Sequence, residues 1–88
     1  MQLTLDIVNE KGLHARASAK FVETVERFDA SAKVSRDGLE VSGDSIMGLL
    51  MLGAACGTTI DIETAGTEAE ALADALRALV AGRFGESA

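Results

Sequence analysis

The residues best suited to chemistry lie in one short segment, Gly12–Val22, which contains His14, the only histidine of the chain. His14 directly precedes a segment that we expect to be helical, where the first backbone N–H groups have no intrahelical acceptor. Such a helix start carries about half a positive charge and binds anions, phosphate in particular. Arg16 adds a planar charged group that matches phosphate oxygens, and an imidazole nitrogen can act as a nucleophile. The segment therefore predicts a histidine that can be phosphorylated.

Two stretches of the sequence resemble signatures of one family. The run Gly12–Ala17 is similar to the active-site motif of the HPr family, usually written Gly-Leu-His-Ala-Arg-Pro, whose members are the histidine-containing phosphocarriers of the bacterial phosphotransferase system. Gly43–Gly53 resembles the second signature of that family, a regulatory serine that opens a short helix. Ala17 departs from the pattern, which commonly has proline there. Alanine keeps an N–H and propagates a helix well, so we expect the chemistry to survive.

The resemblance implies a carrier and not an enzyme with turnover of its own. His14 would accept a phosphoryl group on Nδ1 from enzyme I, which takes it from phosphoenolpyruvate, and would pass it to a IIA-type domain or a nitrogen-branch counterpart. We expect Arg16 to neutralise charge in transit, and the backbone amides of Ala15, Arg16 and Ala17 to bind the phosphoryl oxygens. No cofactor is expected, and the protein is expected to be a monomer.

Ser45 is a second candidate site. As the N-cap of the short helix, a position for which Asp44 is the alternative, it has a complete structural explanation. By the resemblance it is the serine that HPr kinase phosphorylates with ATP, in organisms that have the kinase, which weakens the encounter with enzyme I. The family docks through the helix that Ser45 opens and through the start of the helix after His14. We expect the docking residues to be Lys20, Met47 and Leu50, and the core residues of the short helix to be Ile46, Leu49 and Leu52.

Length and composition limit the other possibilities. The 88 residues suffice for one small domain, residues 1–88, and 48% of them are hydrophobic. No stretch approaches the roughly 20 apolar residues of a membrane span. The start alternates polar and apolar residues and does not resemble a secretion signal, so we expect a cytoplasmic protein. Cys56 is the only cysteine, which excludes an intramolecular disulfide. We also expect no zinc site within the chain, because one cysteine and one histidine supply too few ligands.

The charge of the chain argues against a nucleic-acid or membrane partner. The formal net charge is −6, whereas such partners need clustered lysine and arginine. Lys11, Arg16 and Lys20 nevertheless surround His14 against a single acid, Glu10. This basic island in an acidic molecule suits a phosphoryl group and can steer acidic partner surfaces.

The apolar periodicity predicts four strands and three helices. Alternation marks strands near 3–7, 32–35, 39–41 and 59–63, and Asp37-Gly38 suits a tight hairpin turn. Helical spacing predicts helices over 15–28, over 45–52 with Gly53 after its end, and from a Thr67–Glu70 capping box onward, with the stripe Leu72, Leu76, Leu79 and Val80. Strands with one apolar face need one covering layer. The fold class is α/β (α+β), an open-faced sandwich of order β-α-β-β-α-β-α, and the resemblance implies the strand order 1-4-2-3.

The sequence leaves several alternative functions open. A regulatory protein-binding module of the same fold would need no phosphate relay, although relatives of that kind can lack the histidine that this chain retains. A nitrogen-branch phosphocarrier shares the histidine motif. A small acyl-phosphate hydrolase on a comparable sandwich would turn over a soluble substrate. A nucleic-acid binder is disfavoured, because the outward strand positions carry acids and no aromatic residues.

Overall fold

The four strands form a single antiparallel sheet. The computed structural model describes residues 1–88 and orders the strands β1-β4-β2-β3. The strands are β1 (Gln2–Asp6), β2 (Ser31–Arg36), β3 (Leu39–Ser42) and β4 (Thr59–Ala65). In register, Leu5 pairs with Ile60 and Val34 pairs with Ile62, which aligns the apolar positions of neighbouring strands on one face. The predicted architecture and strand order are confirmed.

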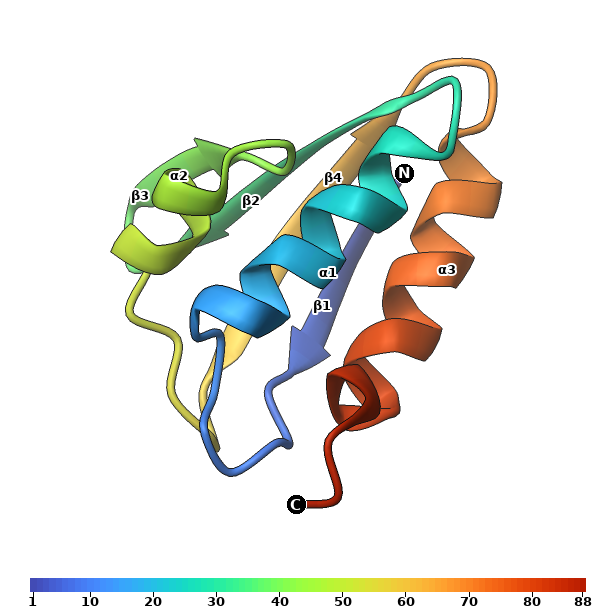
Figure 1. Cartoon of the computed structure of the whole chain (residues 1–88). Coiled ribbons are helices and arrows are strands. Elements are labelled where there is room, and N and C mark those ends of the chain that lie inside the picture. Colours follow the sequence, from blue (N-terminus) through green and yellow to red (C-terminus); the bar gives the residue numbers. More distant parts are fainter.

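Three helices cover one face of this sheet (Figure 1). They are α1 (Ala15–Glu26), α2 (Ile46–Met51) and α3 (Ala69–Ala81), and a 3₁₀ turn, η1 (Arg83–Gly85), follows α3. The core between helices and sheet is almost entirely aliphatic, with two phenylalanines fully buried. Its largest buried side chains are Phe21, Phe84, Ile7, Leu49, Ile60, Ile62, Leu72 and Leu76. None of the helices is both long and apolar enough to span a bilayer.

Local signals in the sequence set the hairpin and the short helix. Asp37 and Gly38 both have positive φ, 51° and 83°, which is the backbone that a two-residue hairpin turn requires. Ser45 is the N-cap of α2, since its Oγ accepts the N–H of Gly48 at 3.0 Å. Gly53, with φ 60°, follows the helix in the left-handed conformation expected of a C′ residue.

The predicted capping box of the last helix is wrong. The helix begins one residue later than expected, with Glu68 as its N-cap, and Glu68 makes no side-chain capping bond. Its carboxylate instead accepts the backbone N–H of Asp29 at 2.8 Å, while its own N–H donates to Asp29 O at 3.0 Å. These bonds to the end of the α1–β2 connection replace the local box, and Thr67 is left exposed.

Two further expectations need correction. The first helix ends at Glu26 and not at Phe28, because the N–H groups of Arg27 and Phe28 bond three residues back and close the helix with a tighter turn. Ile46 is not a core residue, since 40% of its surface is exposed, whereas Leu49 and Leu52 are buried as expected. Ile46 is the first residue of a six-residue helix. It has the three-residue spacing of Leu49 and Leu52 but lies at the end of the helix, where less of the core covers it.

Candidate functional site

A tight loop brings His14 to the start of α1. Gly12 N donates to Asn9 O at 3.1 Å, which closes a turn over Asn9–Gly12, and Leu13 N donates to Ala54 O at 2.9 Å. Gly12 has φ 67°, and a Cβ at this position would lie 2.6 Å from Ala54 O. Glycine is therefore required both for the backbone conformation and for the close approach of the α2–β4 loop.

His14 is itself the N-cap of α1. Its backbone is extended, its C=O accepts the N–H of Ser18 at 2.8 Å, and its Nδ1 accepts the N–H of Arg16 at 3.2 Å. The amides of Ala15 and Ala17 have no backbone acceptor. The helix start thus has the unpaired donors that the sequence predicts, although the third expected phosphate donor, the Arg16 amide, is engaged by the histidine ring.

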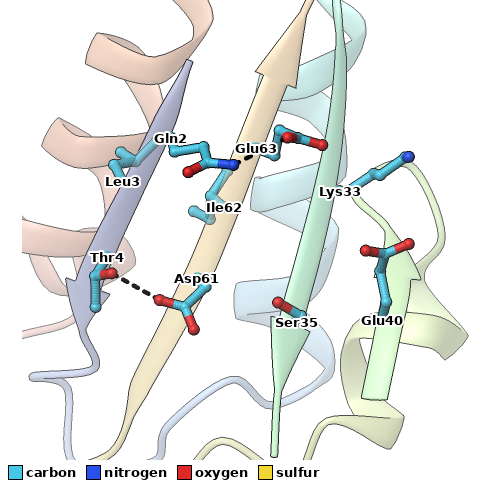
Figure 2. A pocket seen from close by; sticks show the side chains of 9 residues that line it. All are labelled: Gln2, Leu3, Thr4, Lys33, Ser35, Glu40, Asp61, Ile62 and Glu63. Carbon is cyan, nitrogen blue, oxygen red and sulfur yellow. Dashed lines mark hydrogen bonds between the residues drawn. The ribbon is translucent and has the colours of Figure 1, made fainter. Parts of the chain in front are cut away.

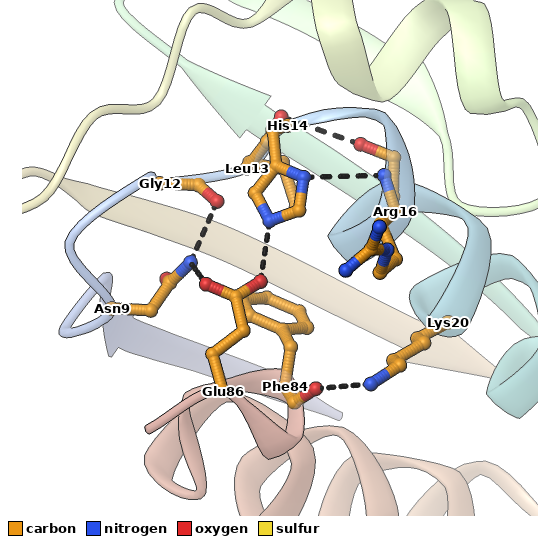
Figure 3. A network of polar contacts seen from close by, with 9 residues as sticks. Asn9, Gly12, Leu13, His14, Arg16, Lys20, Phe84 and Glu86 are labelled. Carbon is orange, nitrogen blue, oxygen red and sulfur yellow. Dashed lines mark hydrogen bonds and ion pairs between the residues drawn. The ribbon is translucent and has the colours of Figure 1, made fainter. Parts of the chain in front are cut away.

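The other ring nitrogen of His14 is held by a residue that the sequence analysis missed. Nε2 contacts Oε2 of Glu86, and the second carboxylate oxygen, Oε1, accepts the side-chain amide of Asn9 at 3.0 Å (Figure 3). Since a carboxylate only accepts, Nε2 carries the ring proton, and since Nδ1 accepts an N–H, it keeps its lone pair. The ring is held as the tautomer whose nucleophilic atom is Nδ1.

Glu86 reaches His14 from the far end of the chain. It follows three residues with positive φ, namely Arg83, Phe84 and Gly85, at 58°, 54° and 80°. We call Arg83–Glu86 the C-terminal strap. Phe84 is fully buried, and the Lys20 ammonium donates to Phe84 O at 2.6 Å (Figure 3). The strap is therefore fixed by an aromatic anchor and a charged donor from α1.

The positive charges near His14 differ in what they contact. The Arg16 side chain is exposed and forms no ion pair or hydrogen bond, so its guanidinium is available to an incoming anion. Lys11 lines a small surface hollow together with Leu13, His14 and the loop Gly53–Ala55. Of the residues expected at the site, the fold brings His14, Arg16 and the amides of Ala15 and Ala17 together, while the Lys20 ammonium is directed to the strap.

The contacts of Glu86 lower the pKa of its carboxyl group below the ordinary value of 4.5, chiefly through the hydrogen bond from His14 and then that from Asn9. Because the pKa is lower in the folded than in the unfolded chain, the carboxylate stabilises the fold above pH 4.5, and this stabilisation is lost as the pH falls through the lowered pKa.

We expect Glu86→Gln to show a smaller loss of unfolding free energy below pH 4.5 than the unmodified protein. Urea unfolding at a series of pH values checks this, with Glu23→Gln on the exposed face of α1 as control; equal acid sensitivity of the Glu86 variant and the unmodified protein would contradict it.

The helix α2 carries an exposed apolar patch beside this site. Met47 and Met51 are 69% and 67% exposed, and Ile46 and Leu50 are about 40% exposed. We call these four residues the α2 patch. Met47 and Leu50 are exposed as expected, and such a patch, rich in flexible methionine, suits contact with several partners. Cys56 is exposed in the loop that follows α2.

A second hollow lies on the opposite side of the molecule and does not suit phosphate. This groove of about 420 Å³ runs along the outer face of the sheet, where Thr4 donates to Asp61 and Gln2 to Glu63 (Figure 2). Lys33 is its one cation, against the carboxylates of Glu40, Asp61 and Glu63. The acidic outer face therefore disfavours an anionic ligand.

The fold and the site define a small carrier of phosphoryl groups, and comparison with known proteins places it among them. Residues 1–82 match the family model described as PTS HPr component phosphorylation site. The chain is 46% identical over 86 residues to the phosphocarrier protein HPr of Cupriavidus necator, covering 98% of this chain and 97% of that one, and 48% identical over 87 residues to HPr of Neisseria meningitidis, with the same coverage.

The crystal structure of HPr from Thermoanaerobacter tengcongensis superimposes with a TM-score of 0.94 and 35% identity, over 100% of this chain and 99% of that one. A phosphocarrier protein NPr from Shewanella violacea is 37% identical over 99% of this chain and 96% of its own. The chain belongs to the HPr family, the phosphocarrier proteins of the phosphotransferase system. It is a phosphoryl carrier in that relay, and the family implies enzyme I and IIA-type domains as its partners.

Proposed function

We propose that His14 accepts the phosphoryl group on Nδ1 from phosphorylated enzyme I and passes it to a IIA-type domain of the sugar branch. The lone pair of Nδ1 forms the new N–P bond while the bond between phosphorus and the donor atom of enzyme I breaks. The ring proton stays on Nε2, so the phosphorylated ring carries a positive charge that faces the Glu86 carboxylate. Transfer to the IIA domain reverses these steps and leaves the carrier unchanged.

The contacts of the two ring nitrogens of His14 are the observation that carries this proposal. Arg16 N donates to Nδ1 and Glu86 accepts from Nε2, so the lone pair of Nδ1 lies on the side of the ring that faces the helix start, where the Arg16 amide must release it before it attacks phosphorus. The amides of Ala15 and Ala17, and the Arg16 amide once Nδ1 is phosphorylated, supply donors for the three phosphoryl oxygens. Most of the rate then comes from position and charge, as phosphoryl transfer requires.

The test is incubation of the protein with phosphoenolpyruvate, magnesium and either type of enzyme I, from the sugar branch or the nitrogen branch. We expect one acid-labile, base-stable phosphoryl group per chain, formed faster with the sugar-branch enzyme. Faster transfer from the nitrogen-branch enzyme would favour the second function, a nitrogen-branch carrier, which the 37% identity to an NPr protein supports. Failure to accept phosphate from either enzyme would refute both.

We further propose that enzyme I docks on the α2 patch and on the exposed start of α1, with Met47 and Leu50 as apolar contacts and Lys20 as a charged one. The partial exposure of the α2 patch and its position beside His14 support this. Lys20 donates one hydrogen to Phe84 O, and an ammonium group has two more for a partner. We also propose that residues 1–88 work as one domain, as a monomer and in the cytoplasm.

Ser45 is proposed as a regulatory phosphorylation site for an HPr kinase. Its hydroxyl caps α2 and lies next to Ile46 and Met47 in the chain, so a phosphate would be favoured by the helix start and would add charge at the edge of the docking surface. The fold would remain, and the contact with enzyme I would be weakened.

Replacing Ser45 with aspartate is expected to keep the melting temperature and to slow phosphoryl transfer from enzyme I, since aspartate is a good N-cap but must be desolvated or must meet acidic groups on docking. Ser45→Ala is the control, and loss of the cap costs it about 1 kcal/mol of stability without added charge. Thermal unfolding is measured beside the transfer rate. Normal transfer by the aspartate variant would reduce Ser45 to a structural cap, and slow transfer with a lowered melting temperature would assign the effect to the fold.

A further inference from the structure

Asn9 is a buried polar residue that lies behind the site and not in it. Its side chain is fully buried, and its amide nitrogen donates both hydrogens, to Gly12 O at 2.8 Å and to Glu86 Oε1 at 3.0 Å. Its Oδ1 has no hydrogen-bond partner. An unpaired buried acceptor is costly, so packing alone does not explain an asparagine here.

The two bonds of the Asn9 amide join the two segments that hold His14. Gly12 belongs to the loop that delivers the histidine backbone to the start of α1, and Glu86 belongs to the C-terminal strap. A carboxylate on a flexible glutamate side chain can rotate away from an imidazole, but the bond from Asn9 fixes Oε1 and thereby directs Oε2 at Nε2 (Figure 3). The loop also contacts the residues after the strap, because Glu10 N donates to Ala88 O at 3.1 Å.

We infer that Asn9 is a positioning residue for phosphoryl transfer, which acts through Glu86 to hold the proton of His14 on Nε2 and the lone pair on Nδ1. This inference rests on the proposed function of His14. In the phosphorylated ring the same arrangement keeps the Glu86 carboxylate against Nε2–H, where the positive charge of the ring develops. Partners that orient a metal-ligating imidazole typically change activity about 10- to 100-fold when they are removed, and we expect the lower end of that range for Asn9 because it acts through Glu86.

The experiment combines kinetics with a direct view of the tautomer. Asn9→Leu keeps the branched shape and the number of heavy atoms of the side chain and removes both donated bonds, and Glu86→Ala removes the group through which Asn9 acts. Transfer from phosphorylated enzyme I is measured in each variant and in the double variant, and the ring ¹⁵N shifts of His14 are recorded at alkaline pH to compare the two neutral tautomers. The single histidine of the chain makes this spectrum unambiguous.

We expect Asn9→Leu to slow transfer about 10-fold, and to change the ¹⁵N spectrum from one with proton-free Nδ1 and protonated Nε2 to one in which both nitrogens share the proton. In the Glu86→Ala background the Asn9 change is expected to have no further effect on either readout. Independent slowing by Asn9→Leu in that background would show that Asn9 acts only on the loop and would overturn the inference. An unchanged spectrum and rate in Asn9→Leu alone would overturn it as well.

Two further variants keep the experiment decisive. If Asn9→Leu is unfolded at the assay temperature, Asn9→Ser, which has one hydroxyl donor, is compared in the same cycle with the same two readouts. Phosphorylation of a His14→Ala variant by enzyme I would refute the proposed function itself, whereas a normal rate and tautomer in the Asn9 variants with phosphate still on His14 would refute only the role of Asn9.

Discussion

Replacing His14 with alanine is expected to abolish the acceptance of phosphate from enzyme I completely. His14 is the only imidazole of the chain, and its Nδ1 carries a lone pair at the helix start, where it accepts the N–H of Arg16. No neighbouring side chain offers a nitrogen nucleophile that is neutral at physiological pH. The measurement is the stoichiometry of acid-labile phosphate after incubation with phosphoenolpyruvate, magnesium and enzyme I.

The control for this prediction must preserve the helix cap, because His14 also accepts the N–H of Arg16. Asparagine is one of the best N-cap residues and is not a phosphoryl acceptor, so His14→Asn is expected to fold with near-normal stability and to accept no phosphate. Alanine lacks the cap and is expected to lose about 1 kcal/mol of stability in addition. Normal phosphorylation of either variant would place the acceptor at another residue and would refute the proposed site.

The elements that were predictable from sequence are those whose signals are local. Alternation of apolar residues placed all four strands, and the Asp37-Gly38 turn was predictable because two consecutive positive φ angles suit few residue types. Ser45 was predictable as a cap because its bond to Gly48 spans three residues. The strand order 1-4-2-3 came from the family resemblance, since pairing of β1 with β4 joins residues 53 to 61 positions apart and leaves no periodic trace.

The errors arose where a tertiary contact replaced a local preference. Thr67 and Glu70 have the spacing of a capping box, but Glu68 bonds to the backbone of Asp29, 39 residues away, and the helix begins after it. Ile46 continues the three-residue spacing of Leu49 and Leu52, yet it is exposed. Spacing identifies the face of a helix on which a residue lies. It does not show how far along that face the sheet and the other helices extend.

The site was predictable on one side of the imidazole only. Gly12, His14 and Arg16 lie close together in the sequence, so the nucleophile and the phosphate-binding start of α1 could be inferred before the structure was known. Glu86 lies 72 residues from His14 and 77 from Asn9, in a strap whose residues Arg83 and Phe84 adopt left-handed conformations that favour glycine. No pattern of residue types signals such a contact. The group that selects the tautomer therefore emerged only from the folded chain.

Arg16 is expected to have the second largest effect on transfer. Its guanidinium forms no ion pair in the free protein and lies on the exposed surface of the first turn of α1, two residues from the acceptor. An exposed side chain without partners contributes little to stability, so Arg16→Ala is expected to change the unfolding free energy by about 0.5 kcal/mol or less. Removal of a charged donor from a transition state of this kind typically lowers the rate by about 10²–10³.

Arg16→Lys separates charge from geometry in this prediction. Lysine keeps the positive charge but lacks the planar fork that donates two parallel hydrogen bonds to phosphoryl oxygens, so we expect it to recover only part of the lost rate. Lys11→Ala, which removes a cation from the loop before α1 without removing a group beside Nδ1, is the matched control and is expected to slow transfer much less. Single-turnover rates from phosphorylated enzyme I and to a IIA domain measure both directions. An unchanged rate in Arg16→Ala would mean that the backbone amides of α1 alone stabilise the transferring group, and the charge of the first turn would then act only in steering the partners together.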